Sequence, residues 1–387
     1  MFSLTRNAIF PILVSLYPLT LIISNITAFK FNFILAIILL ILSINTELRT
    51  FKFAAIIAFA LSFIFVKFGI YGDYSIKEMI VLLFGPLLFN RFVFDFDNLS
   101  THERNVLFYT VSMIGFIVSF FIILQFFDII PMTLGQMEFL NIVGMNVFGE
   151  YDLSFRPSAY FYHPYDTSLA IVPILAFSVI WISRRLSFHS LLLFSVVVMA
   201  VYSLQLKVLY GFVLFIFLFS FFLRNFKIKK IYFFCLALLL TILVLYFSVG
   251  DYSREEVSYS AGRLIIWKFN FEEFFGDFTI LKSLFGLSEN PLESNMSWSN
   301  DEFFSMHNLY MFLIINTGFL FTVIFIYLKQ STLNKSSLVD FCIAIMMFTF
   351  AFTGDLMVFT SYWICISCLY VISSRFGLNV VEKKSFN

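Results

Sequence analysis

An arginine, a histidine and several tyrosines lie close together near residue 160, and these residue types suit the binding of phosphorylated sugars. The segment reads RPSAYFYHPYD, so Arg156 precedes His163 by seven residues, with Tyr160 and Tyr162 between them. A guanidinium fork pairs with phosphate oxygens, and aromatic rings stack on sugar faces. Taken alone, the same residues also fit an aromatic belt at a membrane interface, with one arginine that extends toward water.

A second group begins with Arg263 and Trp267 and ends with His307 and Asn308. Histidine exchanges protons near neutral pH, although a histidine at a helix end is by itself more often structural than catalytic. Gly318 lies eleven residues after His307, which is about three helical turns, so we expect these two residues to share a helix face. A glycine at this place lets a neighbouring helix approach closely.

The composition requires that these groups be held by a membrane bundle. Apolar residues make up 60% of the 387 residues and charged residues 13%, which leaves too little polar surface for a water-soluble globule. Apolar runs of about 20 residues, the length that crosses a bilayer, recur along the chain. The runs are continuous rather than alternating, which favours helices over a closed barrel.

The sequence therefore predicts an all-α polytopic membrane protein, with residues 1–387 as a single integral membrane domain and about twelve transmembrane helices. We find no repeat of fixed period and no soluble domain. The expected spans are 8–27, 32–45, 53–70, 76–90, 106–127, 167–183, 190–206, 208–223, 231–249, 308–328, 338–354 and 356–374.

The distribution of charge predicts the orientation of these spans. If both termini are cytoplasmic, sixteen of the 25 basic residues but only 6 of the 24 acidic residues lie on the inner side, as the positive-inside rule requires. Two long loops, 128–166 and 250–307, then lie outside, and loops of this length usually carry function. Within the second loop, residues 263–280 mix apolar and charged residues in the manner of an interfacial helix.

Five short motifs carry a resemblance to a known family. They are Arg156 with the following His-Pro step, Gly262-Arg263-x3-Trp267, Phe285-Gly286, His307-Asn308, and Gly318. In these motifs and in its architecture the chain resembles the bacterial O-antigen polymerases and O-antigen ligases.

The resemblance implies a type C glycosyltransferase-like bundle in the bacterial inner membrane, with two long periplasmic loops that carry essential arginines. It implies transfer of a glycan from undecaprenyl diphosphate to a sugar hydroxyl, with no metal and no cofactor. The implied partners are an undecaprenyl-diphosphate-linked oligosaccharide and membrane lipids, with a chain-length regulator as a further candidate and no nucleic acid. Polymerase is favoured over ligase, and a polysaccharide flippase is the alternative from another class.

The chemistry assigns roles to the candidate residues. Arg156 and Arg263 would bind the diphosphate leaving group as its negative charge develops. His307 would accept the proton of the attacking hydroxyl, with His163 as second candidate and Glu255, Glu256 and Asp301 as open alternatives. The expected substrate-binding residues are His163, Tyr160, Tyr162, Trp267 and Asn308.

Two further patterns favour structural readings. Asp95-Phe96-Asp97 matches the DxD motif of metal-dependent glycosyltransferases, but Arg91 and Arg104 flank it, and an ordinary solvated loop is favoured. Cys365 and Cys368 form a CxxC within an apolar run, where packing is favoured over metal or redox chemistry.

Overall fold

A computed structural model of the chain describes residues 5–27, 29–44, 76–131, 157, 159–161, 164–204, 272, 274–276, 279–286, 314–315, 318–320, 322–323 and 360–375. Within these ranges every regular element is an α-helix, which confirms the predicted helical class for this part of the chain. The helices are α1 (Arg6–Thr27), α2 (Phe31–Ile44), α4 (Ile76–Asp97), α5 (Thr101–Phe126), α7 (Pro164–Arg184), α8 (Phe188–Leu204), α13 (Ile280–Phe285) and α16 (Thr360–Arg375).

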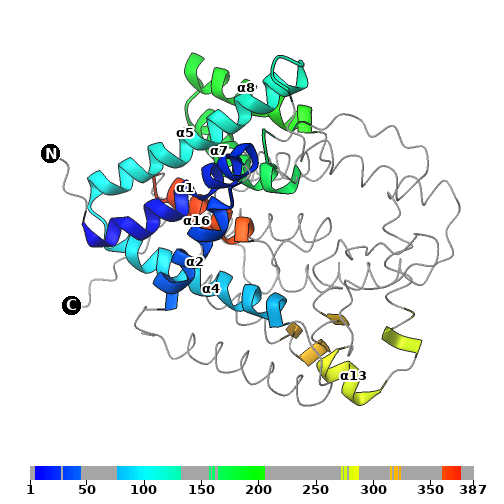
Figure 1. The fold of residues 1–387 in the computed structure, drawn as a ribbon. Helices are drawn as coiled ribbons and strands as arrows, with labels where there is room; N and C mark the ends of the chain where they lie inside the picture. The colour runs from blue at the N-terminus through cyan, green and yellow to red at the C-terminus, as the bar shows by residue number, and fades with distance from the viewer. Residues whose placement is uncertain are drawn as a thin grey trace, which may run out of the picture.

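Helices from both ends of the chain form one bundle (Figure 1). Helix α16, the last described helix, packs against α1, α4, α5 and α7, while α8 covers α5 and α7. Small residues allow the closest contacts: a Cβ at Gly85 of α4 would overlap the indole of Trp363, and one at Gly115 of α5 would lie 2.7 Å from Cβ of Ile174. This use of glycine is typical of helix pairs in membranes. The short α13 lies apart from these helices (Figure 1).

The helices are apolar outside as well as inside. The exposed face of α5 carries a stripe of large apolar side chains at helical spacing, of which Met113 is the most exposed at 65%; its members are Val106, Tyr109, Met113, Phe116 and Phe120. The buried side chains of the bundle include polar ones such as Ser119 and Gln125, both fully buried. Among the described residues, two helices, Asn7–Thr27 and Thr101–Phe126, are by length and composition able to cross a membrane.

Long-range hydrogen bonds fix how the helix ends are grouped. At the end of the bundle where Arg375 lies, which we call the basic end, Thr5 at the start of α1 donates to Glu103 at the start of α5 over 2.7 Å. Arg375 at the end of α16 donates to Asn105 of α5 over 2.7 Å. At the opposite end, the loop end, Asn25 of α1 bonds to Tyr160. Helices α1 and α5 therefore run in one direction and α16 in the other.

The start of α5 is set by a complete capping box. The hydroxyl of Ser100 accepts the backbone N–H of Glu103, and the Glu103 carboxylate accepts the backbone N–H of Ser100 over 3.0 Å. Glu103 also accepts the N–H and hydroxyl of Thr5, which ties α1 to α5. A helix of 26 residues is about 39 Å long, more than the roughly 30 Å of a hydrocarbon core. Because its first five residues, THERN, are all polar, this first turn is the part that extends beyond the apolar segment.

These hydrogen bonds make the stability of the α1–α5 junction depend on pH. Donation from the Thr5 and Ser100 side chains, reinforced by their backbone N–H groups, lowers the pKa of Glu103 from 4.5 to about 2. Since the folded-state pKa is the lower one, the stabilisation is complete above pH 4.5 and is lost as the pH falls toward 2. We expect Glu103→Ala to lower the unfolding free energy by about 1 kcal/mol at pH 7.

Thermal unfolding of the detergent-solubilised protein at pH 7 and pH 3 measures this effect. The difference in unfolding midpoint between wild type and Glu103→Ala should be smaller at the lower pH. Thr110→Val is the control, because the Thr110 hydroxyl bonds only within its own helix, to the Val106 carbonyl. If Glu103→Ala lowers the unfolding midpoint equally at both pH values, the pH dependence assigned to the Glu103 hydrogen bonds is wrong.

The predicted spans overlap the described helices, and the largest difference is at the end of α4. Spans 8–27, 32–45, 106–127, 167–183, 190–206 and 356–374 correspond to α1, α2, α5, α7, α8 and α16 with small shifts. Span 76–90 is too short, since α4 continues to Asp97. The remaining predicted spans lie wholly or largely outside the described residues.

Candidate functional site

The described part of the candidate site is the loop end of the bundle, where the first long loop returns to the helices. Pro157, Ala159 and Phe161 are buried there, and Tyr160 is half-buried. Tyr160 is the predicted site residue that the structure describes. The other predicted site residues lie outside the described residues: Arg156, Tyr162, His163, Arg263, Trp267, His307 and Asn308.

Ala159 and Tyr160 form a strained turn. Their φ angles are +47° and +68°, in the left-handed region, which costs roughly 1–2 kcal/mol for each residue that is not glycine. Such strain persists only where the surroundings enforce it, and it is concentrated at functional sites.

Two side chains of the bundle hold this turn by its backbone. The N–H of Ala159 donates to Oε1 of Gln125 in the last turn of α5 over 2.8 Å. The Tyr160 carbonyl accepts from Nδ2 of Asn25 in α1 over 2.7 Å. Nε2 of Gln125 also makes a longer contact of 3.4 Å with the carbonyl of Pro131, at the start of the same loop.

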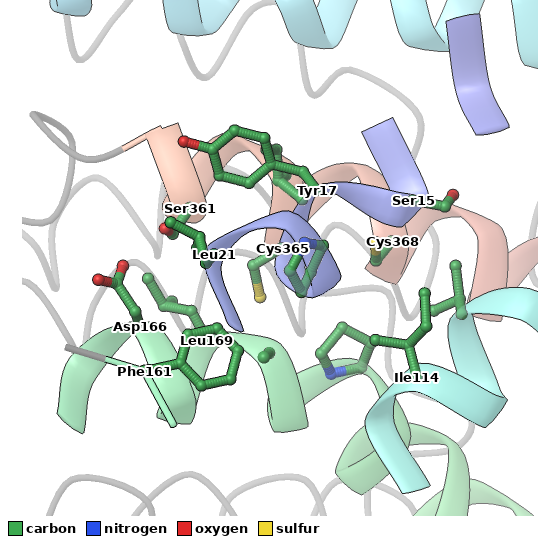
Figure 2. Close-up of a pocket in the computed structure, with 15 residues that line it drawn as sticks. Ser15, Tyr17, Leu21, Ile114, Phe161, Asp166, Leu169, Ser361, Cys365 and Cys368 are labelled. Atoms are coloured by element: carbon green, nitrogen blue, oxygen red, sulfur yellow. The ribbon is translucent and has the colours of Figure 1, made fainter. Parts of the chain in front are cut away.

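The side chains of the turn point in two directions. The ring of Tyr160 meets Phe121 of α5 edge to face, with 5.9 Å between ring centroids. The ring of Phe161 is buried and lines a cavity between α1, α5, α7 and α16 (Figure 2). The turn is therefore anchored to the bundle through its side chains as well as its backbone.

The cavity behind Phe161 is polar at one edge. Asp166 in the first turn of α7 accepts a hydrogen bond from the hydroxyl of Ser361 in the first turn of α16, and Figure 2 shows the two side by side. The starts of these two helices therefore lie together at the loop end. The cavity has room for a water molecule.

The CxxC residues also line this cavity. Cys365 and Cys368 are buried free thiols on α16, as expected for packing. Over the described ranges, no three His, Cys, Asp or Glu side chains are grouped so that they could hold a metal ion.

The Asp95-Phe96-Asp97 sequence is not a solvated loop, and that prediction is wrong. Its residues form the last turn of α4, where Asp95 is fully buried and pairs with Nε of Arg91 over 2.7 Å. Asp97 instead accepts the hydroxyl of Tyr370 over 3.0 Å. The two carboxylates have separate partners and do not converge as DxD metal ligands would.

Two of the motif segments from the second half of the chain meet in space. Gly286, with φ +80°, ends α13 directly after Phe285. A Cβ at Gly318 would overlap the carbonyl of Leu284 and lie 2.6 Å from the backbone nitrogen of Phe285. The close approach expected at Gly318 is therefore confirmed, and the element that approaches is the end of α13.

Gly318 itself is not in regular helical geometry. Its φ is +74°, although residues 314–315 and 318–320 are helical. The shared face with His307 stays a prediction, because His307 lies outside the described residues. The expected interfacial helix is described in part: residues 272 and 274–276 are helical, with Phe274 buried and Glu272 exposed.

No family model, curated protein or solved structure matches this chain.

Sequence reasoning missed Gln125 and Asn25. Each is a polar side chain close to the end of a long apolar run, in FFIILQFFD and LIISNIT. A polar residue in such a position is costly unless it has a partner, and this was the available signal.

Proposed function

We propose that this chain is an integral membrane glycosyltransferase that moves a glycan from a lipid diphosphate to a sugar hydroxyl, and that it is a lipid-linked polysaccharide polymerase. The observation that carries the proposal is the strained turn at the loop end. It lies between Arg156 and His163 in the sequence, and the side-chain amides of Gln125 and Asn25 hold it to a bundle with an apolar surface. A bundle with this exterior suits a lipid-linked substrate.

The grouping of helix ends supports the proposed orientation, with both termini in the cytoplasm of a bacterial cell. The basic end collects Arg104, Arg185 and Arg375, and the start of α1 and the end of α16 both lie there. The loop end carries the first long loop. With the basic end inside, the positive-inside rule is satisfied and the loop faces the periplasm of the inner membrane.

The proposed reaction is a direct displacement. The acceptor hydroxyl oxygen bonds to the anomeric carbon while the bond from that carbon to the diphosphate oxygen breaks. Arg156 and Arg263 bind the diphosphate as it gains charge, and His307 takes the hydroxyl proton. Displacement by one nucleophile inverts the anomeric centre. No metal is needed, because guanidinium groups neutralise the leaving group.

The sibling function is an O-antigen ligase, which would use the same donor chemistry with lipid A-core as acceptor. The flippase reading is less well supported. A flippase would be expected to place charged side chains in a cavity between its helices. The buried Asp95 is already paired with Arg91.

Reconstitution tests this proposal. Purified protein in lipid vesicles, supplied with an undecaprenyl-diphosphate-linked repeat unit, is expected to form polymer at the same rate with and without EDTA. Product in which the anomeric configuration is retained would contradict the direct displacement. Loss of turnover in EDTA with recovery in Mg²⁺ would contradict the metal-independent mechanism.

A further inference from the structure

We propose that Gln125 and Asn25 are positioning residues that clamp the Ala159–Tyr160 turn and thereby fix the first outer loop at the reaction site. The inference rests on the proposed function, since the loop carries Arg156 and His163. Neither amide needs to touch substrate for this role.

The clamp gives partners to a buried polar side chain of α5. Gln125 is fully buried at the end of an apolar helix, where an amide without partners would be costly. The loop backbone supplies partners from both of its ends, the Ala159 N–H at 2.8 Å and the Pro131 carbonyl at 3.4 Å. One side chain therefore joins the beginning and the end of the long loop to α5.

The second arm of the clamp comes from a different helix. Asn25 in α1 bonds to the very next residue of the turn, through the carbonyl of Tyr160. The Gln125 acceptor and the Asn25 donor hold the peptide groups that flank a left-handed turn, in which two residues without glycine's freedom have φ +47° and +68°. The local chain does not favour this geometry, so contacts with the bundle must enforce it, and the two amides are the ones that hold the backbone of the turn.

The position of the clamp matters for the charged residues. Arg156 lies three residues before Ala159 and His163 three residues after Tyr160, which is a chain length of at most about 11 Å on each side. Buried Pro157 and Phe161 shorten the free chain further. A displacement of about 1 Å at a charge-stabilising group can cost roughly 100-fold in rate, so the loss of the clamp should reduce catalysis without removing any reacting group.

Hydrogen exchange and kinetics on the purified full chain test the clamp together. The Ala159 amide should exchange at least tenfold faster in Gln125→Met and in Asn25→Leu than in wild type. The matched control is Asn98→Leu, because Nδ2 of Asn98 also donates to a carbonyl, but to that of Phe94, four residues earlier in the last turn of α4. Gln125→Met and Asn25→Leu should lower kcat for polymer formation about tenfold, with little change in KM for the lipid-linked donor.

The outcomes separate the clamp from the proposed function. Unchanged exchange at Ala159 in both variants would overturn the clamp, whatever the kinetics. Faster exchange with an unchanged kcat would overturn the positioning role and leave the proposed function standing. If the wild-type protein forms no polymer, the proposed function is wrong, and so is the positioning role. The exchange rate of the Ala159 amide would still test whether the clamp exists. Because the two variants lie on different helices, the clamp can still be tested with one of them if the other fails to fold.

Discussion

Arg263→Lys is expected to lower the rate of glycan transfer about 100-fold or more, the loss typical of removing one donor to developing charge. Lysine keeps the positive charge, but it is a point charge and cannot form two parallel hydrogen bonds to the diphosphate. The expected change is in kcat, because the leaving group gains its charge in the transition state. Initial rates of polymer formation in vesicles measure this effect.

Lys268→Arg is the matched control for this variant. It exchanges the same two residue types only five positions later in the same segment, at a residue with no proposed role in the reaction. Its rate should equal that of wild type. If Arg263→Lys also retains full activity, Arg263 is a residue that snorkels toward water rather than a catalytic group.

Gly318→Ala is expected to destabilise the protein by about 2–5 kcal/mol. The left-handed φ of +74° costs an alanine roughly 1–2 kcal/mol, and the overlap of its Cβ with the backbone of Leu284 and Phe285 adds about 1–3 kcal/mol. Backbone atoms cannot move aside as a flexible side chain would. The variant should therefore show a large fall in the midpoint of thermal unfolding, or no folded protein in the membrane.

Gly276→Ala provides the comparison. Gly276 lies in a helical segment close to α13, and a Cβ there would have no atom within 4 Å. This variant should be as stable as wild type. Equal unfolding midpoints for Gly318→Ala and wild type would show that the contact between Gly318 and α13 is absent in the folded protein.

Local patterns predicted the helices of this fold well. Apolar runs long enough to cross a membrane located α1, α5 and α7, because burial in lipid or in a bundle both require a continuous apolar helix. The end of α4 was misjudged because Arg91 and Asp95 suggested a loop. One turn apart on a helix, these charges pair with each other, so they extend the helix instead of ending it.

Local sequence patterns could not predict the long-range contacts. The bonds from Gln125 to Ala159 and from Asn25 to Tyr160 join residues 34 and 135 positions apart, and no local pattern specifies such partners. The left-handed turn between them contains no glycine that would have marked it. Gly318 was an exception, since a lone glycine in an apolar run correctly indicated a close approach, though not its partner.

The most direct test of the central claim is the envelope-glycan ladder from cells that lack this gene, complemented at matched membrane levels with wild type or His307→Ala. Our account predicts a single repeat unit attached to core in the deletion strain, a full ladder with wild type, and no ladder with His307→Ala. Bare core, with long chains retained on the lipid carrier, would identify a ligase instead. A full ladder with His307→Ala would contradict the assigned base, and an unchanged ladder in the deletion strain would contradict the proposed glycosyltransferase itself.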